Sequence, residues 1–345
     1  MNSQSGGAST PAQANPARSG DPGASTPARA NPARSEDPGA STPARANPAR
    51  SGDPGASTPA RANPARSGDP GAAPILCAHL LRRVDEKLID LLSSLTPSEW
   101  DLQTVAPSWK VRDVAAHLLD TTLRKLSLVR DQWYVDAVDI RSPQDVITLV
   151  NHLNREGVTV YRRLSPPVLI DMMKLACEQS AGFHESLDPF APAAFSVSWA
   201  GEATSLNWFD TARELTERWH HQQQIRLATY RPGIMTPDLY HPVLDCFMRG
   251  LPHHFRDVEA PDGTTLLVEI SGECGGSWYL SKGMAGWNLA RPSSGEFAAQ
   301  VTIPQDLAWR LFTKGIDRDL PRGQIEIGGN RDLGERVLDL TAIVG

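Results

Sequence analysis

The first fifth of the chain is a tandem repeat that is excluded from any packed core. The block 19–34 recurs directly after itself, from Ser35 and again from Ser51. The segment contains no aromatic residue, and Met1 is its only large aliphatic side chain. It buries too little apolar surface to offset the conformational entropy lost on folding. Each proline also disfavours the helical conformation of the residue before it. We predict a disordered, extended tail over residues 1–73.

Charge divides unevenly between this tail and the rest of the chain. The tail carries seven arginines against five acidic residues, so its net charge is +2. Because the whole chain is at −6, the remainder carries −8. A body this acidic argues against nucleic acid as the main partner. The arginines of the tail are evenly spaced rather than clustered. We therefore predict no nucleic-acid partner.

The sequence shows no membrane span and no secretory signal. No stretch approaches the roughly 18 apolar residues of a spanning helix, and the N-terminus lacks an apolar signal core. The four cysteines are far apart in the sequence and form no CxxC pair: Cys77, Cys177, Cys246 and Cys274. This pattern is typical of reduced thiols rather than of a disulfide scaffold. We predict a cytoplasmic protein without a membrane partner.

From Ile75 onward the sequence predicts a helical domain over residues 74–258. Apolar side chains recur at helical spacing, with charged residues between them. Ser108 is the expected N-cap of the second helix, because its hydroxyl can accept from free amides of the first turn. The predicted helices cover residues 75–95, 110–130, 144–164, 167–187, 206–228 and 239–254. Their number and length indicate a bundle of four or more helices.

The remaining residues, 259–345, predict a small α+β domain. Short runs rich in β-branched and aromatic residues are separated by Gly and Pro. The predicted strands cover residues 264–270, 277–281, 286–290, 298–303 and 324–327, and the predicted helices 305–313 and 331–340. Strands grouped apart from helices favour an α+β fold around an antiparallel sheet. A turn-rich link at 259–263 marks the domain boundary.

The helix at 206–228 carries two metal-ligand side chains at a favourable spacing. Glu217 and His221 are four residues apart, which places their Cβ atoms about 5–6 Å apart on one helix face. His117 lies on the amphipathic helix at 110–130. A bundle brings inward side chains of facing helices to a common interior point. We predict that His117, Glu217 and His221 bind one divalent ion.

Three protein ligands leave coordination positions open, which is typical of catalytic rather than structural metal sites. Imidazole and carboxylate together suit Zn²⁺, our first candidate, and also Ni²⁺, Co²⁺ or Fe²⁺. No serine nucleophile elbow, phosphate-binding glycine loop or dinucleotide fingerprint is present. The metal constellation is therefore the chemically suggestive cluster of this sequence.

Three neighbouring residues are alternatives or additions at this site. His220 is next to His221 but about 100° away around the helix, so we expect it to point aside. Asp113 precedes His117 by four residues and either adds a ligand or orients its ring. Gln224 follows His221 by one turn and is a candidate to contact a ligand residue rather than the ion.

The sequence resembles the DinB-like, mycothiol-dependent maleylpyruvate isomerase superfamily over most of 75–345. The motifs are the turn at 95–100, the helix start at 108–118 and the Glu217-x-x-x-His221-x-x-Gln224-Ile225 segment. The segments 309–316 and 325–330 resemble the C-terminal domain of the isomerase. The repeat tail lies outside the family pattern.

The resemblance implies a four-helix bundle that holds a divalent ion through the three predicted ligands. It also implies that a low-molecular-weight thiol of the mycothiol type is a cosubstrate and reacts with a small electrophile, by isomerisation or S-transfer. An arginine of the second domain contributes to activity in the isomerase. Arg318 is our first candidate for this catalytic role, followed by Arg310 and Arg322.

Two function classes follow. The first is a metal- and thiol-dependent isomerase or transferase, and the open coordination position favours it. The second is a non-catalytic module that binds a metal or a small ligand, with the tail as a tether. Metal analysis and a thiol-consumption assay separate the two classes.

Overall fold

The computed structural model describes residues 73–133, 142–291, 296–316 and 323–343. All of them belong to one compact unit, Thr58–Gly345. The predicted tail, up to residue 72, lies outside the described residues. Helices and a five-stranded sheet together form the predicted α+β fold. The boundary at residues 258 and 259 stays a prediction.

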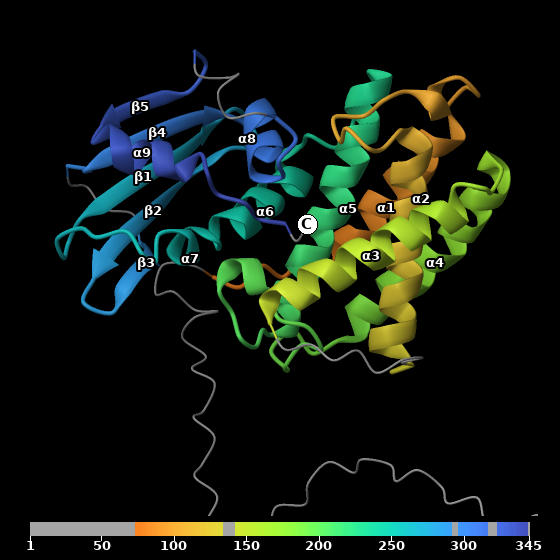
Figure 1. Cartoon of the computed structure of the whole chain (residues 1–345), viewed down its shortest axis with the longest axis horizontal. Helices are drawn as coiled ribbons and strands as arrows, with labels where there is room; N and C mark the ends of the chain where they lie inside the picture. Colours follow the sequence, from red (N-terminus) through yellow and green to blue (C-terminus); the bar gives the residue numbers. More distant parts are fainter. Residues whose placement is uncertain (1–72, 134–141, 292–295, 317–322, 344–345) are drawn as a thin grey trace, which may run out of the picture. The chain divides into compact units, whose positions relative to one another are not determined.

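Four long helices form the expected bundle (Figure 1). They are α1 (Ala78–Ser93), α2 (Val111–Lys125), α4 (Pro166–Ser186) and α5 (Asn207–Thr229). Both α1 and α2 contact α4 and α5, so the four helices share one interior. A fifth helix, α3 (Pro143–Tyr161), packs on α2. Helices α2 and α5 therefore meet inside the bundle, where their inward side chains can converge.

The start and end of α2 differ from the sequence prediction in detail. Lys110 rather than Ser108 is the N-cap, and its backbone amide donates to the Asp113 carboxylate at 3.0 Å. A π-helical turn, η2 (Leu126–Arg130), continues the helix at its C-terminal end. Asp113 thus satisfies an amide that the helix leaves without a partner. The acidic side chain in the first turn also complements the helix dipole.

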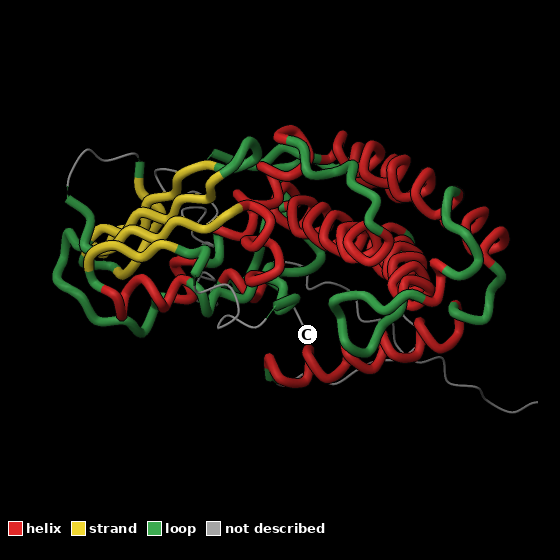
Figure 2. Tube along the Cα trace, turned by 90° about the horizontal axis from the view of Figure 1, so that it is seen from above, coloured by secondary structure: helices red, strands yellow, loops and turns green. Residues whose placement is uncertain are grey.

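The five-stranded sheet follows in the C-terminal part (Figure 2). Its strands are β1 (Thr265–Ser271), β2 (Gly276–Gly283), β3 (Gly286–Ala290), β4 (Ala299–Pro304) and β5 (Glu326–Gly329). The spatial order is β3-β2-β1-β4-β5.

The sheet is mixed, whereas the sequence predicted an antiparallel one. Strand β1 pairs parallel with β4, with Val268 opposite Val301, and all other neighbours in the sheet are antiparallel. The prediction was wrong at this pair because β4 does not continue the hairpin sequence beside β3. The chain instead crosses over so that β4 pairs with the edge of β1 that faces away from β2. A crossover connection of this kind joins parallel strands.

Further helices complete the C-terminal part and join its core to α5. They are α6 (Pro237–Met248), α7 (Leu251–His254), α8 (Gln305–Phe312) and α9 (Arg331–Val337). The fully buried Trp219 of α5 stacks on Tyr240 of α6, with ring centroids 4.2 Å apart. The Trp219 ring also lies 6.1 Å from that of Trp309 in α8. One side of α5 is thereby fixed against this core.

A buried network of charged side chains lies inside the bundle. Arg218 of α5 pairs with Asp85 of α1 and donates to the Ser180 hydroxyl of α4 at 2.7 Å. Lys125 of α2 pairs with Asp210 of α5 at 2.6 Å. These charged side chains are all nearly inaccessible to solvent. Because unpaired buried charges are costly, the network constrains how α1, α2, α4 and α5 pack.

His184 should make the folded protein sensitive to acid. Its Nδ1 lies 3.2 Å from the Thr211 hydroxyl, and burial lowers the pKa of the imidazole to about 4. The unfolded chain, with an imidazole pKa near ~6.5, binds a proton first as the pH falls. Below about pH 6.5 the free energy of unfolding should therefore fall, by ~1.4 kcal/mol per pH unit for this group, until about pH 4.

Urea unfolding at pH 7, 6 and 5 measures this contribution. His184→Gln should show a shallower loss of stability between pH 6.5 and 4 than the unchanged protein. Asp85 acts in the opposite direction in both proteins, since burial raises the pKa of its carboxyl to about 6. Equal slopes for the two proteins would show that His184 does not contribute.

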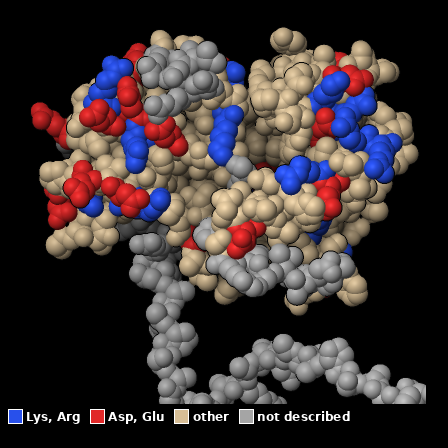
Figure 3. All heavy atoms as spheres, viewed as in Figure 1, with Lys and Arg blue, Asp and Glu red and all other residues tan. Residues whose placement is uncertain are grey.

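The surface of the described residues carries both signs of charge, intermingled on the face shown in Figure 3. Within the part of the chain that the structure describes, no helix is both long and apolar enough to span a bilayer.

Candidate metal centre

His117 lies in the middle of α2 and is 5% exposed. Its ring packs against Trp109, with centroids 4.6 Å apart. Val114 and Leu118, on either side of it, are buried in the bundle core. The apolar spacing of α2 therefore turns His117 inward, as the sequence predicted.

Glu217 and His221 lie one turn apart on α5 and face each other. The Glu217 Oε2 atom is 3.5 Å from the His221 Nε2 atom. On its other side the His221 ring is held by Gln224, whose Oε1 lies 3.0 Å from Nδ1. Because an amide oxygen only accepts, Nδ1 carries the proton and Nε2 offers a lone pair toward Glu217.

The two helices bring His117 beside His221, which in turn contacts Glu217. The rings of His117 and His221 are 4.6 Å apart between centroids and stand edge-on at 70°. The Trp109 ring contacts both, since its centroid is also 5.8 Å from that of His221. The loop before α2 thus covers the two histidines with an indole. The sequence pattern gave no indication that Trp109 would contact the two histidines.

His220 joins this cluster, contrary to the expectation that it points aside. One ligand atom from each of Glu217, His220 and His221 lies within 4.8 Å of the others. The two histidine rings are 4.0 Å apart between centroids. The expectation was wrong because helical position sets only the direction of Cα–Cβ. The rotation of the side chain brings the ring back, with Nδ1 2.8 Å from the Thr216 carbonyl.

One ring nitrogen of His117 supports a ligand role. Nδ1 is buried and makes no hydrogen bond in the described structure. Asp113 does not orient the His117 ring through Nδ1. Its carboxylate instead accepts a hydrogen bond from the Lys110 amide and lies 3.2 Å from Arg162. A buried polar atom without a partner costs free energy. The His117 ring therefore has unused binding capacity beside the His221 ring.

The electrostatics favour the protonation states that bind metal. Burial lowers the pKa of His117 well below its usual value and that of His220 to about 4. Burial alone would raise the pKa of Glu217, but its contact with His221 and the nearby His220 and Arg213 side chains lower that pKa to about 2. Two neutral imidazoles and one carboxylate are thus present at neutral pH, and these are the forms that ligate metal ions.

Gln224 should tune metal affinity without touching the ion. Its hydrogen bond fixes the tautomer and direction of the His221 ring, as partners of ligating histidines do. We expect Gln224→Ala to weaken Zn²⁺ binding by about 10–100-fold, measured by competition with a chelating indicator. Gln223→Ala, one residue earlier on the same helix, is the control. Equal affinities in the two variants would remove this role from Gln224.

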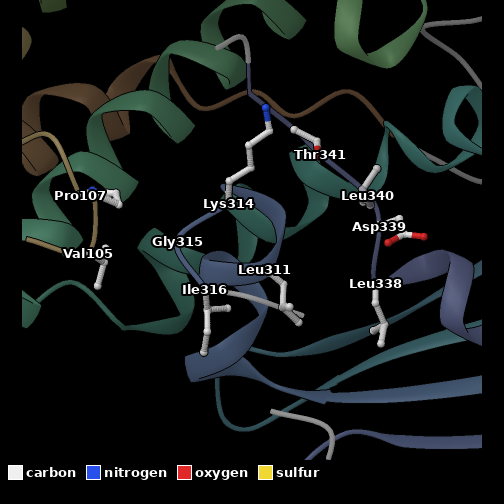
Figure 4. Close-up of a pocket in the computed structure, with 10 residues that line it drawn as sticks. All are labelled: Val105, Pro107, Leu311, Lys314, Gly315, Ile316, Leu338, Asp339, Leu340 and Thr341. Carbon is white, nitrogen blue, oxygen red and sulfur yellow. The ribbon is translucent and has the colours of Figure 1, made fainter. Parts of the chain in front are cut away.

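A pocket of about 500 Å³ lies next to the loop that carries Trp109 (Figure 4). The loop contributes Val105 and Pro107, and the other walls come from the end of α8 with the residues after it and from the C-terminal segment. The lining residues are Val105, Pro107, Leu311, Lys314, Gly315, Ile316, Leu338, Asp339, Leu340 and Thr341. A ligand in this pocket would contact the same loop that covers the histidines.

The predicted catalytic arginine, Arg318, lies outside the described residues, as does Arg322. Arg310 is described and lies in the last turn of α8. The four cysteines are buried and free, as expected for reduced thiols.

Comparison with known proteins agrees with the resemblance read from the sequence. Residues 81–226, which include all the cluster residues, match the family model of the Mycothiol maleylpyruvate isomerase N-terminal domain. No curated protein sequence matches the chain. Two similar solved structures are the mycothiol-dependent maleylpyruvate isomerase and a point mutant of it.

The mutant structure has 11% sequence identity and a TM-score of 0.44, and covers 71% of this chain and 90% of its own. The other has 12% identity and a TM-score of 0.43, and covers 69% of this chain and 88% of its own.

Proposed function

We propose, on the premise that residues 81–226 carry the Mycothiol maleylpyruvate isomerase N-terminal domain, that this protein is a divalent-metal-dependent enzyme. In this proposal His117, Glu217 and His221 hold one ion, with Zn²⁺ as the first candidate. The cosubstrate would be a low-molecular-weight thiol of the mycothiol type, which binding at this site would activate. The thiol then reacts with a small electrophilic substrate, by isomerisation or by S-transfer.

The convergence of α2 and α5 carries the proposal. Two imidazoles 4.6 Å apart and a carboxylate oxygen 3.5 Å from one of them meet in a largely buried position. The Nδ1 atom of His117 has no hydrogen-bond partner there. Nitrogen and oxygen donors in this combination suit Zn²⁺ and its first-row neighbours.

The residues of the site would divide the work as follows. When bound, the ion supplies positive charge that favours the thiolate form of a nearby thiol at neutral pH. His117 and His221 would contribute uncharged nitrogen ligands, which leave this charge intact, whereas the Glu217 carboxylate would offset one unit of it. Gln224 holds the direction of the His221 ring. Trp109 covers both imidazoles, which limits the access of water to the site.

A two-channel assay tests the catalytic step. Protein loaded with Zn²⁺ is incubated with mycothiol, bacillithiol or glutathione and a panel of electrophiles that includes cis-configured unsaturated acids. S-transfer consumes the thiol, whereas isomerisation regenerates it and changes only the substrate, so both are followed. Metal-dependent turnover in either channel supports the proposal. Absence of turnover with every pair would favour a binding module.

The binding-module alternative has one specific observation in its favour. His220 offers a further nitrogen beside Glu217 and His221. Four protein donors are typical of closed, structural metal sites. A protein that retains its metal but never binds a thiol would belong to this class.

Arg318 remains our proposal for the catalytic arginine. Loss of one positively charged group that stabilises a developing anion costs roughly 100-fold in turnover. We therefore expect Arg318→Ala to lower kcat/KM about 100-fold while metal content stays unchanged. Arg322→Ala and Arg310→Ala are the matched controls in the same domain. A larger loss in either control would move the role to that residue.

A further inference from the structure

We propose that His220 is a fourth protein donor, so that the resting metal centre is formed by His117, Glu217, His220 and His221. The inference rests on the proposed metal site and concerns how many of its positions the chain itself fills. It differs from the three-ligand pattern predicted from the sequence, in which an exogenous thiol takes a free position.

The distances are close to those of donors on one ion. One ligand atom from each of Glu217, His220 and His221 lies within 4.8 Å of the others. Two donors that are each about 2.1 Å from Zn²⁺ lie at most about 4.2 Å apart. Small rotations of side chains therefore suffice to bring these atoms onto one ion. The rings of His220 and His221 already lie 4.0 Å apart between centroids.

The hydrogen bonding of His220 prepares the ring for coordination. Nδ1 lies 2.8 Å from the Thr216 carbonyl, which can only accept, so Nδ1 carries the proton. Nε2 then holds the lone pair. In a ligating histidine, one ring N–H usually donates a hydrogen bond to a carbonyl or carboxylate oxygen, and the other ring nitrogen binds the metal. His221 has the same arrangement through Gln224.

The position of His220 favours a ligand role over that of a histidine that only fills space in the core. His220 is 2% exposed, and its ring lies against the His221 ring and near the Glu217 carboxylate. His117 is not within 4.8 Å of all three of these donors, but its ring lies 4.6 Å from that of His221. With it the donors number four, the number that closes a tetrahedral zinc site. A thiol would then reach the ion by displacing His220 or by adding a fifth ligand.

X-ray absorption spectroscopy of the full chain loaded with Zn²⁺ tests the proposal, because the scattering pattern counts imidazole ligands. We expect three imidazoles in the unchanged protein and two in His220→Ala. Zn²⁺ affinity in His220→Ala, measured by chelator competition, should fall by at least the ~10–100-fold that follows when a residue hydrogen-bonded to a ligand is lost. His184→Ala removes a buried histidine from the same bundle and is the control, with three imidazoles expected.

The unchanged protein keeps the test decisive even if a variant fails to fold. Two imidazoles in the unchanged protein would overturn the role of His220 while leaving the proposed function intact. The same holds if His220→Ala folds and keeps both its imidazole count and its affinity. If the unchanged protein binds no Zn²⁺ or Co²⁺, the proposed metal site fails and this inference fails with it.

Discussion

His221→Ala should remove stoichiometric metal from the purified protein. The unchanged protein should contain close to one equivalent of divalent metal by elemental analysis. His221 lies at the centre of the cluster, since it is near Glu217, His117 and His220. Its loss deprives the ion of a direct donor. Metal affinity should therefore fall by more than the ~10–100-fold expected when a residue that only hydrogen-bonds to a ligand is lost. We expect the variant to retain less than about a tenth of an equivalent after dialysis against a weak chelator.

His184→Ala is the matched control, because it removes another buried histidine of the bundle whose hydrogen-bond partner is Thr211. That variant should keep its metal. Circular dichroism of both variants checks that the helices are intact. Full metal retention in a folded His221→Ala protein would contradict the predicted ligand set, whatever the outcome of activity assays.

The local part of this site was accessible from the sequence. Helical spacing placed Glu217 and His221 on one face, and their side chains are in contact. The spacing of apolar residues around His117 turned it toward the bundle interior. Both inferences depend on a regular helix, in which neighbours at i and i+4 have fixed separation. Element boundaries also agreed within a few residues, as for the predicted 206–228 and the observed α5, Asn207–Thr229.

Features that depend on side-chain rotation or on distant partners were not accessible. The rotation that brings His220 toward His221 is coupled to a hydrogen bond with Thr216, which helical angles alone do not reveal. The packing of Trp109 on two histidines depends on the path of a loop. The parallel pair of β1 and β4 depends on pairing across the chain, since strand patterns show burial but not neighbours.

The burial and pairing of charged residues inside the bundle likewise could not be predicted from the sequence pattern. Arg218 and Asp85 are separated by 133 positions and read as ordinary surface residues of two amphipathic helices. In the structure each is at most 5% exposed in its side chain, and they pair with each other. Helix amphipathicity identifies the face that packs inward but does not show which charged residues at its edge become buried.

Arg218→Ala should therefore be among the most destabilising single substitutions in the bundle. It leaves the Asp85 carboxylate buried without its cation and the Ser180 hydroxyl without its donor. Removing one partner of a buried ion pair typically costs about 3–5 kcal/mol. We expect a loss of that size in the free energy of unfolding, measured by urea titration at pH 7.5 on the metal-free protein.

The pH dependence of this loss identifies its cause. Burial already raises the pKa of Asp85 to about 6, and Arg218 opposes that rise. Without Arg218 the folded-state pKa should rise further above its unfolded value. The penalty is then present above the folded pKa and is relieved as the pH falls through it, because Asp85 binds a proton. Arg218→Ala should thus be less destabilising at pH 5.5 than at pH 8.

Arg82→Ala removes a partly exposed arginine paired with the more exposed Glu178 and Glu185, and should leave stability nearly unchanged at both pH values. Equal losses in the two variants would show that burial of the Arg218 pair does not determine its contribution.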